Sequence, residues 1–530
     1  MVIKRYAAKS RATPKPPVFT CKWDTTQAGS SNDTVVLPLV SNGSYNFQVD
    51  WGDGTRETIT AHNQAEKTHQ YASTGIYEVR IIGGISGWYF RNVGDDEKLI
   101  EISSWGPLTI TDGYQGFYRC VNLDVTAIDA PTISTYRLQS FFTSCNGGDQ
   151  GNMNFWDTSS VTNMSSVFAH SDFNQPIGNW DLSNVTTIYG MFERCSNFNQ
   201  PIGDWDTSNV TNMRRMFDNT SSDRTMSFDQ DVGNWDVGKV TDFRDMFRGY
   251  YNASPFTNGG SSSITGWDTS SAQYMGSMFY KCTGFNQPIG NWDTSKVTDM
   301  HHMLRLCNSF DQDLGGWDVT GVLGFSNFFA NNPVFNNGGS TGINNWRPLS
   351  CTNMYGMFEK CDSFNQPIGD WDTSNVTTMR RMFDNTDSVI TMSFDQDIGN
   401  WDVGKVTDFR EMFRSYYNAS PFTNGGSSSI GGWDTSSAQY MNSMFYRCTG
   451  FNQSLSGWNV SSVTNASSFM QLCTLSTANY DSTLGGWSSQ SVQNGVSIHF
   501  GNSQYSSATG AAYRTALINA GWTITDGGQA

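Results

Sequence analysis

A short sequence unit recurs along most of this 530-residue chain and restricts the possible folds more than any other feature. One clean unit runs from Phe198 to Phe217 and reads FNQPIGDWDTSNVTNMRRMF. Its tryptophan recurs most often at an interval of 25 residues, with others of 29, 30 and 32. A period of roughly 20–50 residues predicts a stack of units, because one unit cannot bury its own apolar face. The tryptophans that mark the repeat are Trp105, Trp156, Trp180, Trp205, Trp235, Trp267, Trp292, Trp317, Trp346, Trp371, Trp401, Trp433, Trp458 and Trp487.

A longer duplication is superimposed on the short repeat. Residues 190–292 recur at 356–458 with a constant offset of 166 and no gap. The match includes polar positions as well as apolar ones, so Tyr250-Tyr251 correspond to Tyr416-Tyr417. We therefore expect a block of about four units, surface features included, to be present twice.

Within one unit, apolar spacing predicts a short helix. Val210, Met213 and Phe217 lie three and four residues apart, which places them on one helical face. The DTSN segment before them supplies residues that cap helices. The other half, FNQPIGDW, is expected to form a short strand or extended run, weakened by Pro201.

Eight of the ten cysteines occupy one position of the repeat, three residues after the unit's last Phe or its substitute. Thr220, Tyr250, Thr386 and Tyr416 stand at this position in units that are otherwise intact, which a required disulfide would not tolerate. We expect buried free thiols that pack as small apolar groups; a Cys282–Cys307 bond between neighbouring units is the alternative. The cysteines at this position are Cys120, Cys145, Cys195, Cys282, Cys307, Cys361, Cys448 and Cys473.

Residues 18–83 have a different pattern, typical of a small β domain. Residues 45–49 and 76–81 alternate apolar and polar side chains, as half-buried strands do. Between them, Asp53-Gly54 predicts a tight hairpin turn. Asp50 and Asp53 are therefore expected to be turn residues rather than a catalytic carboxylate pair.

Two resemblances follow from these motifs. WGDGT at 51–55, with HQY at 69–71 and GIYEV at 75–79, resembles the PKD family of immunoglobulin-like sandwiches. The repeats resemble the MFxxCxxFNQxIxxWDxSxVTxM unit of BspA-type leucine-rich-repeat surface proteins. These resemblances imply a mainly β fold with short helical turns: a PKD-like β-sandwich at 18–83, a leucine-rich-repeat solenoid of about 14 coils at 84–475, and a capping segment at 476–530.

Composition and motifs argue against several classes of function. A net charge of −16 disfavours a nucleic-acid partner, and no apolar run is long enough for membrane insertion. No nucleophile elbow, phosphate loop or HExxH is present, so we expect no enzyme and no cofactor. The aspartates after the tryptophans are expected to stabilise turns, with structural calcium as the alternative. These are Asp157, Asp181, Asp206, Asp236, Asp268, Asp293, Asp318, Asp372, Asp402 and Asp434.

Two segments are candidate partner surfaces. Aromatic residues lie among Asn, Ser and Gly in the longer units, which is the composition of adaptable binding surfaces; the alternative is that they pack back onto the core. The N-terminal arm, residues 1–17, carries five basic residues and no acid; it is either an anchor on an acidic partner or a disordered tail. The aromatic candidates are Tyr250, Tyr251, Phe256, Tyr416, Tyr417 and Phe422, and the arm candidates are Lys4, Arg5, Lys9, Arg11 and Lys15.

These observations together predict a non-enzymatic structural protein of a bacteriophage virion surface, such as a fibre, decoration or appendage. The start of the chain has no apolar signal region, whereas its modules resemble extracellular ones, and release by lysis reconciles the two. The arm would bind other virion proteins, and the repeats would contact glycans or proteins of a host or the environment. Alternatives are a bacterial cell-surface adhesin exported unconventionally and, less favoured, a carbohydrate-active enzyme.

Overall fold

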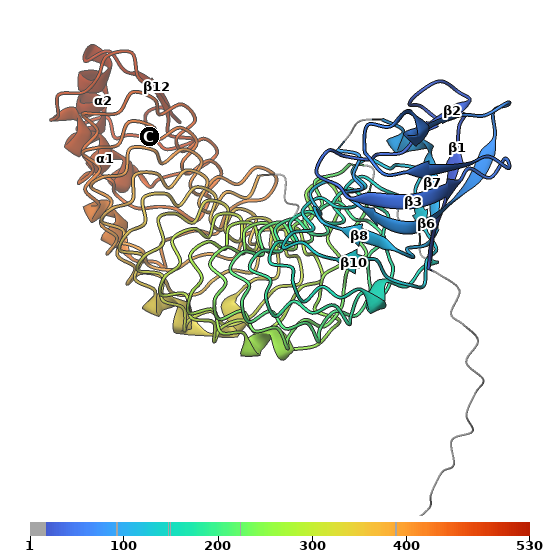
Figure 1. Ribbon diagram of the computed structural model, residues 1–530. Coiled ribbons are helices and arrows are strands. Elements are labelled where there is room, and N and C mark those ends of the chain that lie inside the picture. Colours follow the sequence, from blue (N-terminus) through green and yellow to red (C-terminus); the bar gives the residue numbers. More distant parts are fainter. Residues whose placement is uncertain (1–16, 92–93, 147, 149, 223, 387–389) are drawn as a thin grey trace, which may run out of the picture. The chain divides into compact units, whose positions relative to one another are not determined.

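The computed structural model describes residues 17–91, 94–146, 148, 150–222, 224–386 and 390–530. The fold is mainly β with few helices, and it carries tandem repeats. The chain forms two compact units, residues 1–184 and 185–530 (Figure 1). The five basic residues of the predicted arm, Lys4 to Lys15, lie outside the described residues.

The first unit begins with a β-sheet in which four strands pair antiparallel, in the order β4-β3-β6-β1. Two shorter strands, β2 and β5, form a separate antiparallel pair. The strands predicted at 45–49 and 76–81 are confirmed as parts of β3 and β6. The bounds are β1 Val18–Asp24, β2 Thr34–Val36, β3 Tyr45–Asp50, β4 Arg56–Ile59, β5 Thr68–Gln70 and β6 Ile76–Ser86.

This sheet continues beyond residue 83, the boundary expected from sequence. β7 pairs antiparallel with β1, whereas β8, β9 and β10 add in parallel to β6, β7 and β8 respectively. The first repeats are therefore hydrogen-bonded directly to the N-terminal sheet. The bounds are β7 Leu99–Ser104, β8 Leu108–Ile110, β9 Asp124–Val125 and β10 Thr132–Ile133.

The hairpin between β3 and β4 confirms the turn role of its two aspartates. Asp50 accepts a hydrogen bond from the Gly52 N–H at 3.1 Å, and Asp53 accepts one from the Thr55 N–H at 2.9 Å. Gly54 has a φ of 97°, a conformation that favours glycine. The second oxygen of Asp53 bonds to His69 Nε2 at 2.8 Å, so both carboxylates serve the turn.

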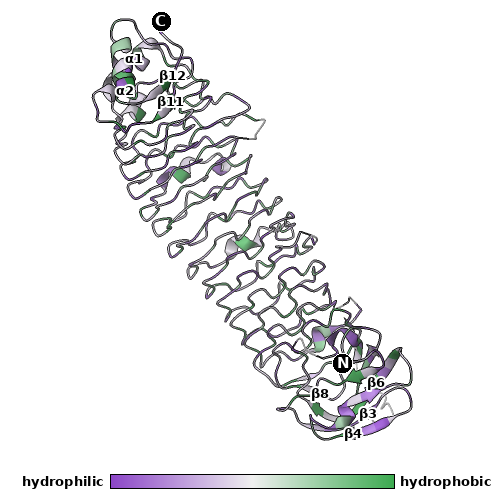
Figure 2. Ribbon diagram, turned by 90° about the horizontal axis from the view of Figure 1, so that it is seen from above, coloured by the Kyte–Doolittle hydropathy of each residue, from purple (hydrophilic) through white to green (hydrophobic). Residues whose placement is uncertain are grey.

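In the second unit, successive repeats stack along the chain (Figure 2). Aromatic rings at equivalent positions of these repeats stack on one another in columns. The rings of Phe192, Phe217, Phe247 and Phe279 follow one another at 5.4, 5.6 and 5.8 Å. The column tryptophans from Trp235 to Trp487 also donate from the indole N–H to a carbonyl of the preceding repeat, as Trp235 does to Ile202 at 2.9 Å. Burial of these rings supplies the core, since large aromatic groups contribute most to packing energy.

We call the part of each repeat that corresponds to residues 210–217 the Val–Met–Phe segment. Its backbone does not form the predicted helix. Alternate residues donate their N–H groups to the next repeat: Met213 to Asp242, Arg215 to Arg244 and Phe217 to Met246, at 2.8–3.0 Å. The intervening Met216 N–H closes a tight turn onto the Met213 carbonyl, and Arg215 adopts a φ of 57°. The three-residue spacing thus comes from a turn, because bonds to the neighbouring repeat replace the i to i−4 bonds of a helix.

The helical turns instead lie in the other half of the repeat, where the sequence predicted a strand. Several end at the residue before a column tryptophan, as η4 does before Trp267. The 3₁₀ bounds are η1 Ala65–Lys67, η2 Asp96–Lys98, η3 Met153–Phe155, η4 Ser263–Gly266, η5 Asn337–Gly339, η6 Thr341–Asn345 and η7 Ser428–Gly432. The predicted helix was therefore wrong. In the regular unit at 198–205 no strand is assigned to the FNQPIGDW half, and residues 203–204 form a turn.

The C-terminal end of the second unit has a structure of its own. Figure 2 shows α1, α2, β11 and β12 together at this end of the stack. β11 and β12 pair in parallel, and an Ala466–Ile498 bridge joins β11 to the last regular repeat. The bounds are α1 Thr477–Ser488, β11 Ser497–His499, α2 Gly510–Asn519 and β12 Thr523–Thr525.

The prediction of free, buried thiols is confirmed for all ten cysteines. The thiol of Cys282 donates to the carbonyl of Phe247 at 3.2 Å, and that of Cys307 to Phe279 at 3.0 Å. In each case the acceptor is the column Phe of the preceding repeat, so the thiol closes a contact between neighbours. Burial raises the pKa of the Cys282 thiol to about 12, which suppresses the reactive thiolate.

We predict that iodoacetamide labels none of the ten cysteines in the native chain and all ten in guanidinium chloride. The reason is that alkylation needs an accessible thiolate, and every thiol is buried. Mass spectrometry of tryptic peptides measures the labelling. Rapid native labelling of Cys282 or Cys307 would contradict the stacked arrangement.

Candidate binding surfaces

Two four-residue loops, 250–253 and 416–419, project from the stacked repeats, and we call them the tyrosine loops. Gly249 donates to the Tyr280 carbonyl at 2.9 Å, and Ser254 donates to the carbonyl of the next residue, Lys281, at 3.0 Å. The backbone hydrogen bonds that join neighbouring repeats form a ladder. The chain leaves this ladder after Gly249 and rejoins it at Ser254, and the loop between them projects outward. Ser420 rejoins the ladder in the same way at Arg447.

Each loop displays two exposed tyrosines, as the sequence predicted. Tyr250 and Tyr251 are 49% and 56% exposed, and Tyr416 and Tyr417 are 51% and 53% exposed. The rings of each pair meet edge to face, with centroids 5.0 and 5.3 Å apart. The two copies thus present the same aromatic surface.

A third tyrosine from the next repeat completes each cluster. Tyr280 stacks on Tyr250, and Tyr446 stacks on Tyr416, both with centroids 6.2 Å apart. Sequence reasoning missed Tyr280 and Tyr446 because they lie in regular units without an insert. Alignment of the units in register would have found them, since each follows the column Phe directly and stands two residues before a Cys.

A basic side chain fixes each loop from the same neighbouring repeat. Lys281 Nζ donates to the carbonyl of Tyr251 at 2.5 Å, and Arg447 Nη1 donates to the carbonyl of Tyr416 at 2.7 Å. These bonds satisfy loop carbonyls that have left the ladder. Each loop is consequently held in place by a hydrogen bond from the next repeat.

The structure corrects the assignment of Phe256 and Phe422 to this surface. Both rings are buried, at 0% and 1% exposure, and they occupy a column between their neighbours. Phe256, for example, stacks between Phe228 and Phe285 at 6.4 and 6.2 Å. The expected alternative, packing back onto the core, holds for the phenylalanines but not for the tyrosines.

The same loops explain a second correction. Tyr250 and Tyr416 do not occupy the cysteine position of their repeats, because that position is inside the stack. Ser254 takes it in the first copy: it is 1% exposed and forms a bridge with Cys282. Ser420 takes it in the second copy, where it is also buried. Sequence spacing failed here because the loop adds residues before the chain returns to the core.

Beside the first tyrosine loop lies a buried ion pair. The guanidinium of Arg248 donates two hydrogen bonds to Asp218, at 2.8 and 2.7 Å, and contacts Asp245 at 2.7 Å. The Asp218 side chain is fully buried, and burial raises its pKa to about 6 although Arg248 opposes the shift. The Arg248 guanidinium also lies 5.8 Å from the Tyr250 ring centroid, so the ion pair and the aromatic cluster touch.

The second copy repeats this ion pair with one substitution. Arg414 donates to Asp384 at 3.1 and 2.9 Å, and Glu411 replaces Asp245 as the second carboxylate. The longer Glu411 side chain also reaches Arg381 at 2.6 Å. The duplicated surface therefore retains its charge arrangement as well as its tyrosines.

The copies differ on the far side of Tyr280. His302 lies 6.1 Å from the Tyr280 ring, and the Arg305 guanidinium lies 5.8 Å from it. The corresponding residues after Tyr446 are Ser468 and Gln471. The first cluster is thus bordered by basic and aromatic side chains, and the second by small polar ones.

The aspartates after the column tryptophans were predicted to stabilise turns, and the structure confirms this role. Each aspartate after a column tryptophan accepts the backbone N–H two residues later, as Asp206 does from Ser208 at 3.1 Å. The asparagine of FNQ joins repeats: Asn199 Oδ1 accepts from Gln230 Nε2 at 2.9 Å and from the Asp229 N–H at 3.0 Å. These side chains are engaged by the fold itself.

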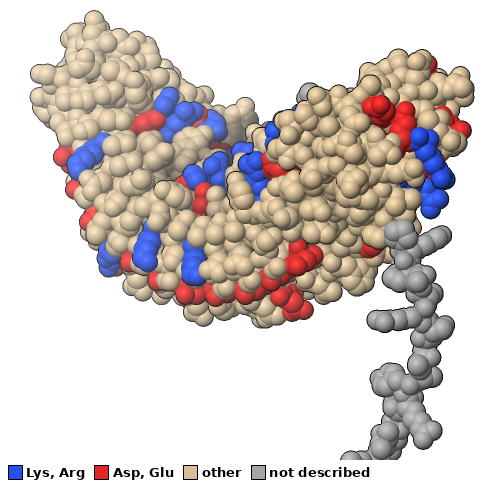
Figure 3. Space-filling view, in the orientation of Figure 1, with Lys and Arg blue, Asp and Glu red and all other residues tan. Residues whose placement is uncertain are grey.

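Figure 3 shows that charged side chains on the visible face form small mixed groups between large uncharged areas, with a row of acidic side chains along the lower edge. Within the described residues, no group of three or more His, Cys, Asp or Glu is placed to hold a metal ion. No helix in the described part of the chain is long and apolar enough to cross a membrane.

Comparison with family models identifies the repeats. A model described as "Mycoplasma protein of unknown function, DUF285" matches residues 136–259, 251–342, 336–428 and 416–511, which together span residues 136–511. The chain belongs to the DUF285 family. Comparison with curated proteins finds no match. The four tandem DUF285 segments include both tyrosine loops and both buried ion pairs.

We predict that Arg248→Ala lowers the free energy of unfolding by about 2–4 kcal/mol, because it removes the bidentate partner of a fully buried carboxylate. Arg244→Ala is the matched control. Arg244 pairs with Asp242 at a partly exposed position and should change stability by less than about 1 kcal/mol. Urea unfolding followed by tryptophan fluorescence measures both. Equal losses in the two variants would contradict the ion pair's role.

A second prediction concerns His302. Burial and the nearby Arg305 lower its pKa to about 4, below the value of about 6.5 in the unfolded chain. The unfolded state then binds the proton more readily, so His302 costs stability as pH falls from about 6.5 to about 4. His302→Ser, which copies Ser468, should remove about 1–2 kcal/mol of this loss between pH 7 and pH 4.5. Urea unfolding at both pH values tests it; identical pH dependence in variant and wild type would contradict it.

Proposed function

We propose that this DUF285 protein is a non-enzymatic display protein whose two tyrosine loops bind a glycan or protein on a surface. The observation that carries the proposal is the duplication of one exposed cluster, with three tyrosines beside a buried Arg–Asp pair, in both 190–292 and 356–458 blocks. Exposed tyrosine supplies contact area at low entropic cost, which suits recognition. The polar columns that might have suggested catalysis serve turns and ladders.

The proposed architecture is a leucine-rich-repeat solenoid of the BspA type that follows a PKD-like sandwich. Its support is the stacking of repeats through ring columns and parallel bridges in the second unit, and the two sets of paired strands in the first. In such a fold the loops that interrupt the repeat are the natural places for specific contacts, because the regular positions are used for stacking.

The two clusters belong to one stack, so one molecule offers two equivalent contacts. Six steps of the inner Phe column separate Phe256 from Phe422, at 5.8–6.2 Å each, or about 36 Å along the column. A repetitive surface can occupy both clusters at once, which increases avidity without any new contact. Two weak sites are then sufficient for firm attachment.

We further propose that the carrier is a virion surface, with a bacterial cell surface as the alternative. Mass spectrometry of purified virions from a producing lysate separates the two. Recovery of the chain at a constant ratio to capsid protein supports the virion, whereas recovery only in cell-envelope fractions supports the cell surface.

The loops are tested by alanine variants on a glycan and protein array. Replacing Tyr250, Tyr251, Tyr416 and Tyr417 together should abolish binding, while replacing one pair should weaken it about tenfold or more through lost avidity. Tyr513, an exposed tyrosine outside the loops, is the matched control, and Tyr513→Ala should bind as the wild type does. Unchanged binding by the quadruple variant would exclude the loops.

A further inference from the structure

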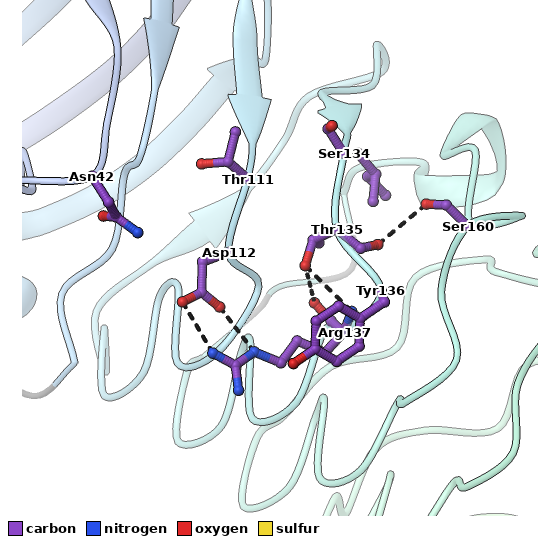
Figure 4. Close-up of a pocket in the computed structure, with 9 residues that line it drawn as sticks. Asn42, Thr111, Asp112, Ser134, Thr135, Tyr136, Arg137 and Ser160 are labelled. Atoms are coloured by element: carbon purple, nitrogen blue, oxygen red, sulfur yellow. Dashed lines mark hydrogen bonds and ion pairs between the residues drawn. The ribbon is translucent and has the colours of Figure 1, made fainter.

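The first unit contains a groove of about 640 Å³ that lies away from the tyrosine loops in sequence. Asn42 reaches it from the turn before β3, Thr111 and Asp112 from the end of β8, and residues 134–137 from the segment after β10 (Figure 4). Ser160 of the following repeat closes one side. The volume falls within the range of about 300–1,000 Å³ that small-molecule sites occupy.

Two residues that line the groove, Tyr136 and Arg137, end a row of alternating aromatic and guanidinium groups that begins outside it. The Arg91 guanidinium lies 4.0 Å from the Tyr89 ring centroid and 5.7 Å from that of Tyr114. Arg137 continues the row, at 5.0 Å from Tyr114 and 5.7 Å from Tyr136. Tyr136 ends the row and is 62% exposed, so its ring is held on one side and open on the other.

A single carboxylate binds both guanidinium groups of this row. Asp112 accepts two hydrogen bonds from Arg137, at 3.0 and 3.1 Å, and one from Arg91 at 2.8 Å. Burial alone would raise the pKa of Asp112, but the Arg137 bonds hold it below its usual range. Asp112 and Arg137 line the groove, and Arg91 binds Asp112 from outside the lining, so these three groups together carry one positive charge in excess on a chain whose net charge is −16.

Several polar groups at the groove remain available to a ligand. Arg137 uses Nε and Nη2 for Asp112, and its Nη1 makes no hydrogen bond to any described residue. Asn42 accepts the Tyr89 hydroxyl at Oδ1, which leaves its Nδ2 donors without a partner in the described part of the chain. The hydroxyls of Thr111 and Ser134 likewise make no hydrogen bond within the described residues. Figure 4 shows these groups around one opening.

We propose that this groove binds a carboxylate-bearing sugar unit of an acidic polysaccharide. The sugar ring packs on the open face of Tyr136, and its carboxylate accepts from Nη1 of Arg137. Its hydroxyls bond to the Asn42 amide and to the Thr111 and Ser134 hydroxyls. An aromatic face with a few fixed polar groups is the usual composition of a site that orients a small polar ligand.

The same chemistry disfavours other anionic or extended ligands. A nucleic acid needs several basic contacts along its phosphate backbone, and Arg137 is the one basic residue that lines this groove. A peptide needs an apolar pocket for an anchoring side chain, and Ile133 is the one aliphatic residue that lines this groove. The sugar is therefore the ligand class that uses the available groups.

The test is titration of the full chain with sodium polygalacturonate and, separately, with neutral dextran, followed by calorimetry. We expect binding to polygalacturonate that weakens as NaCl rises, because a charge pair contributes to it. Tyr136→Ala should reduce this affinity about tenfold or more, since the stacking surface is lost. Asn42→Ala should reduce it by a smaller factor through loss of one amide donor.

Two controls keep the result interpretable. Tyr136 is exposed, so thermal unfolding of Tyr136→Ala should match the wild type. The quadruple variant of the tyrosine loops should retain polygalacturonate binding, so this site and the proposed loop function can fail separately. Absence of polygalacturonate binding, equal binding of dextran, or undiminished binding by Tyr136→Ala would each overturn the proposal.

Discussion

The hydrogen bonds between neighbouring repeats are the constraint on which the second unit depends. In the Val–Met–Phe segment, alternate N–H groups have their partners in the next repeat rather than in their own. A repeat removed from its neighbours would expose these donors and its phenylalanine and tryptophan rings together, which no short segment can tolerate. Side chains follow the same rule, since the indole of Trp235 and the thiol of Cys282 both donate to the preceding repeat.

This constraint determines where variation can occur. Positions inside the columns accept few changes, and Ser254 shows that even an interrupted repeat returns a small side chain to the cysteine position. Inserted residues are therefore accommodated where the chain leaves the ladder, as in the tyrosine loops. Because Lys281 and Arg447 come from the next regular repeat, each loop is held by a repeat that has no insert of its own. The side chains of such a loop are not needed for stacking, while its backbone is held at a fixed position.

Sequence reasoning recovered what depends on periodicity and missed what depends on backbone geometry. The free thiols, the turn aspartates such as Asp206 and the exposure of Tyr250 followed from repeated residue types. The interior of the repeat did not, because Val210–Met213–Phe217 spacing fits either a helix or a tight turn bonded to its neighbour. Only the positive φ at Arg215 separates the two, and arginine carries no signal for it. The groove around Tyr136 was also invisible, since its residues are distant in sequence.

The direction of the ladder bonds has a consequence for assembly. In the Val–Met–Phe segment, Met213 and Arg215 donate to the next repeat whereas Thr211 donates to the preceding one, so an open end presents both free donors and free acceptors. The two opposite ends of a stack are complementary, and uncapped fragments could join head to tail into filaments. The last regular repeat does not present an open end, because Met470 donates to His499 in β11 and β11 pairs with β12. The C-terminal segment thus covers the core of the last regular repeat. It also limits head-to-tail joining of stacks at this end.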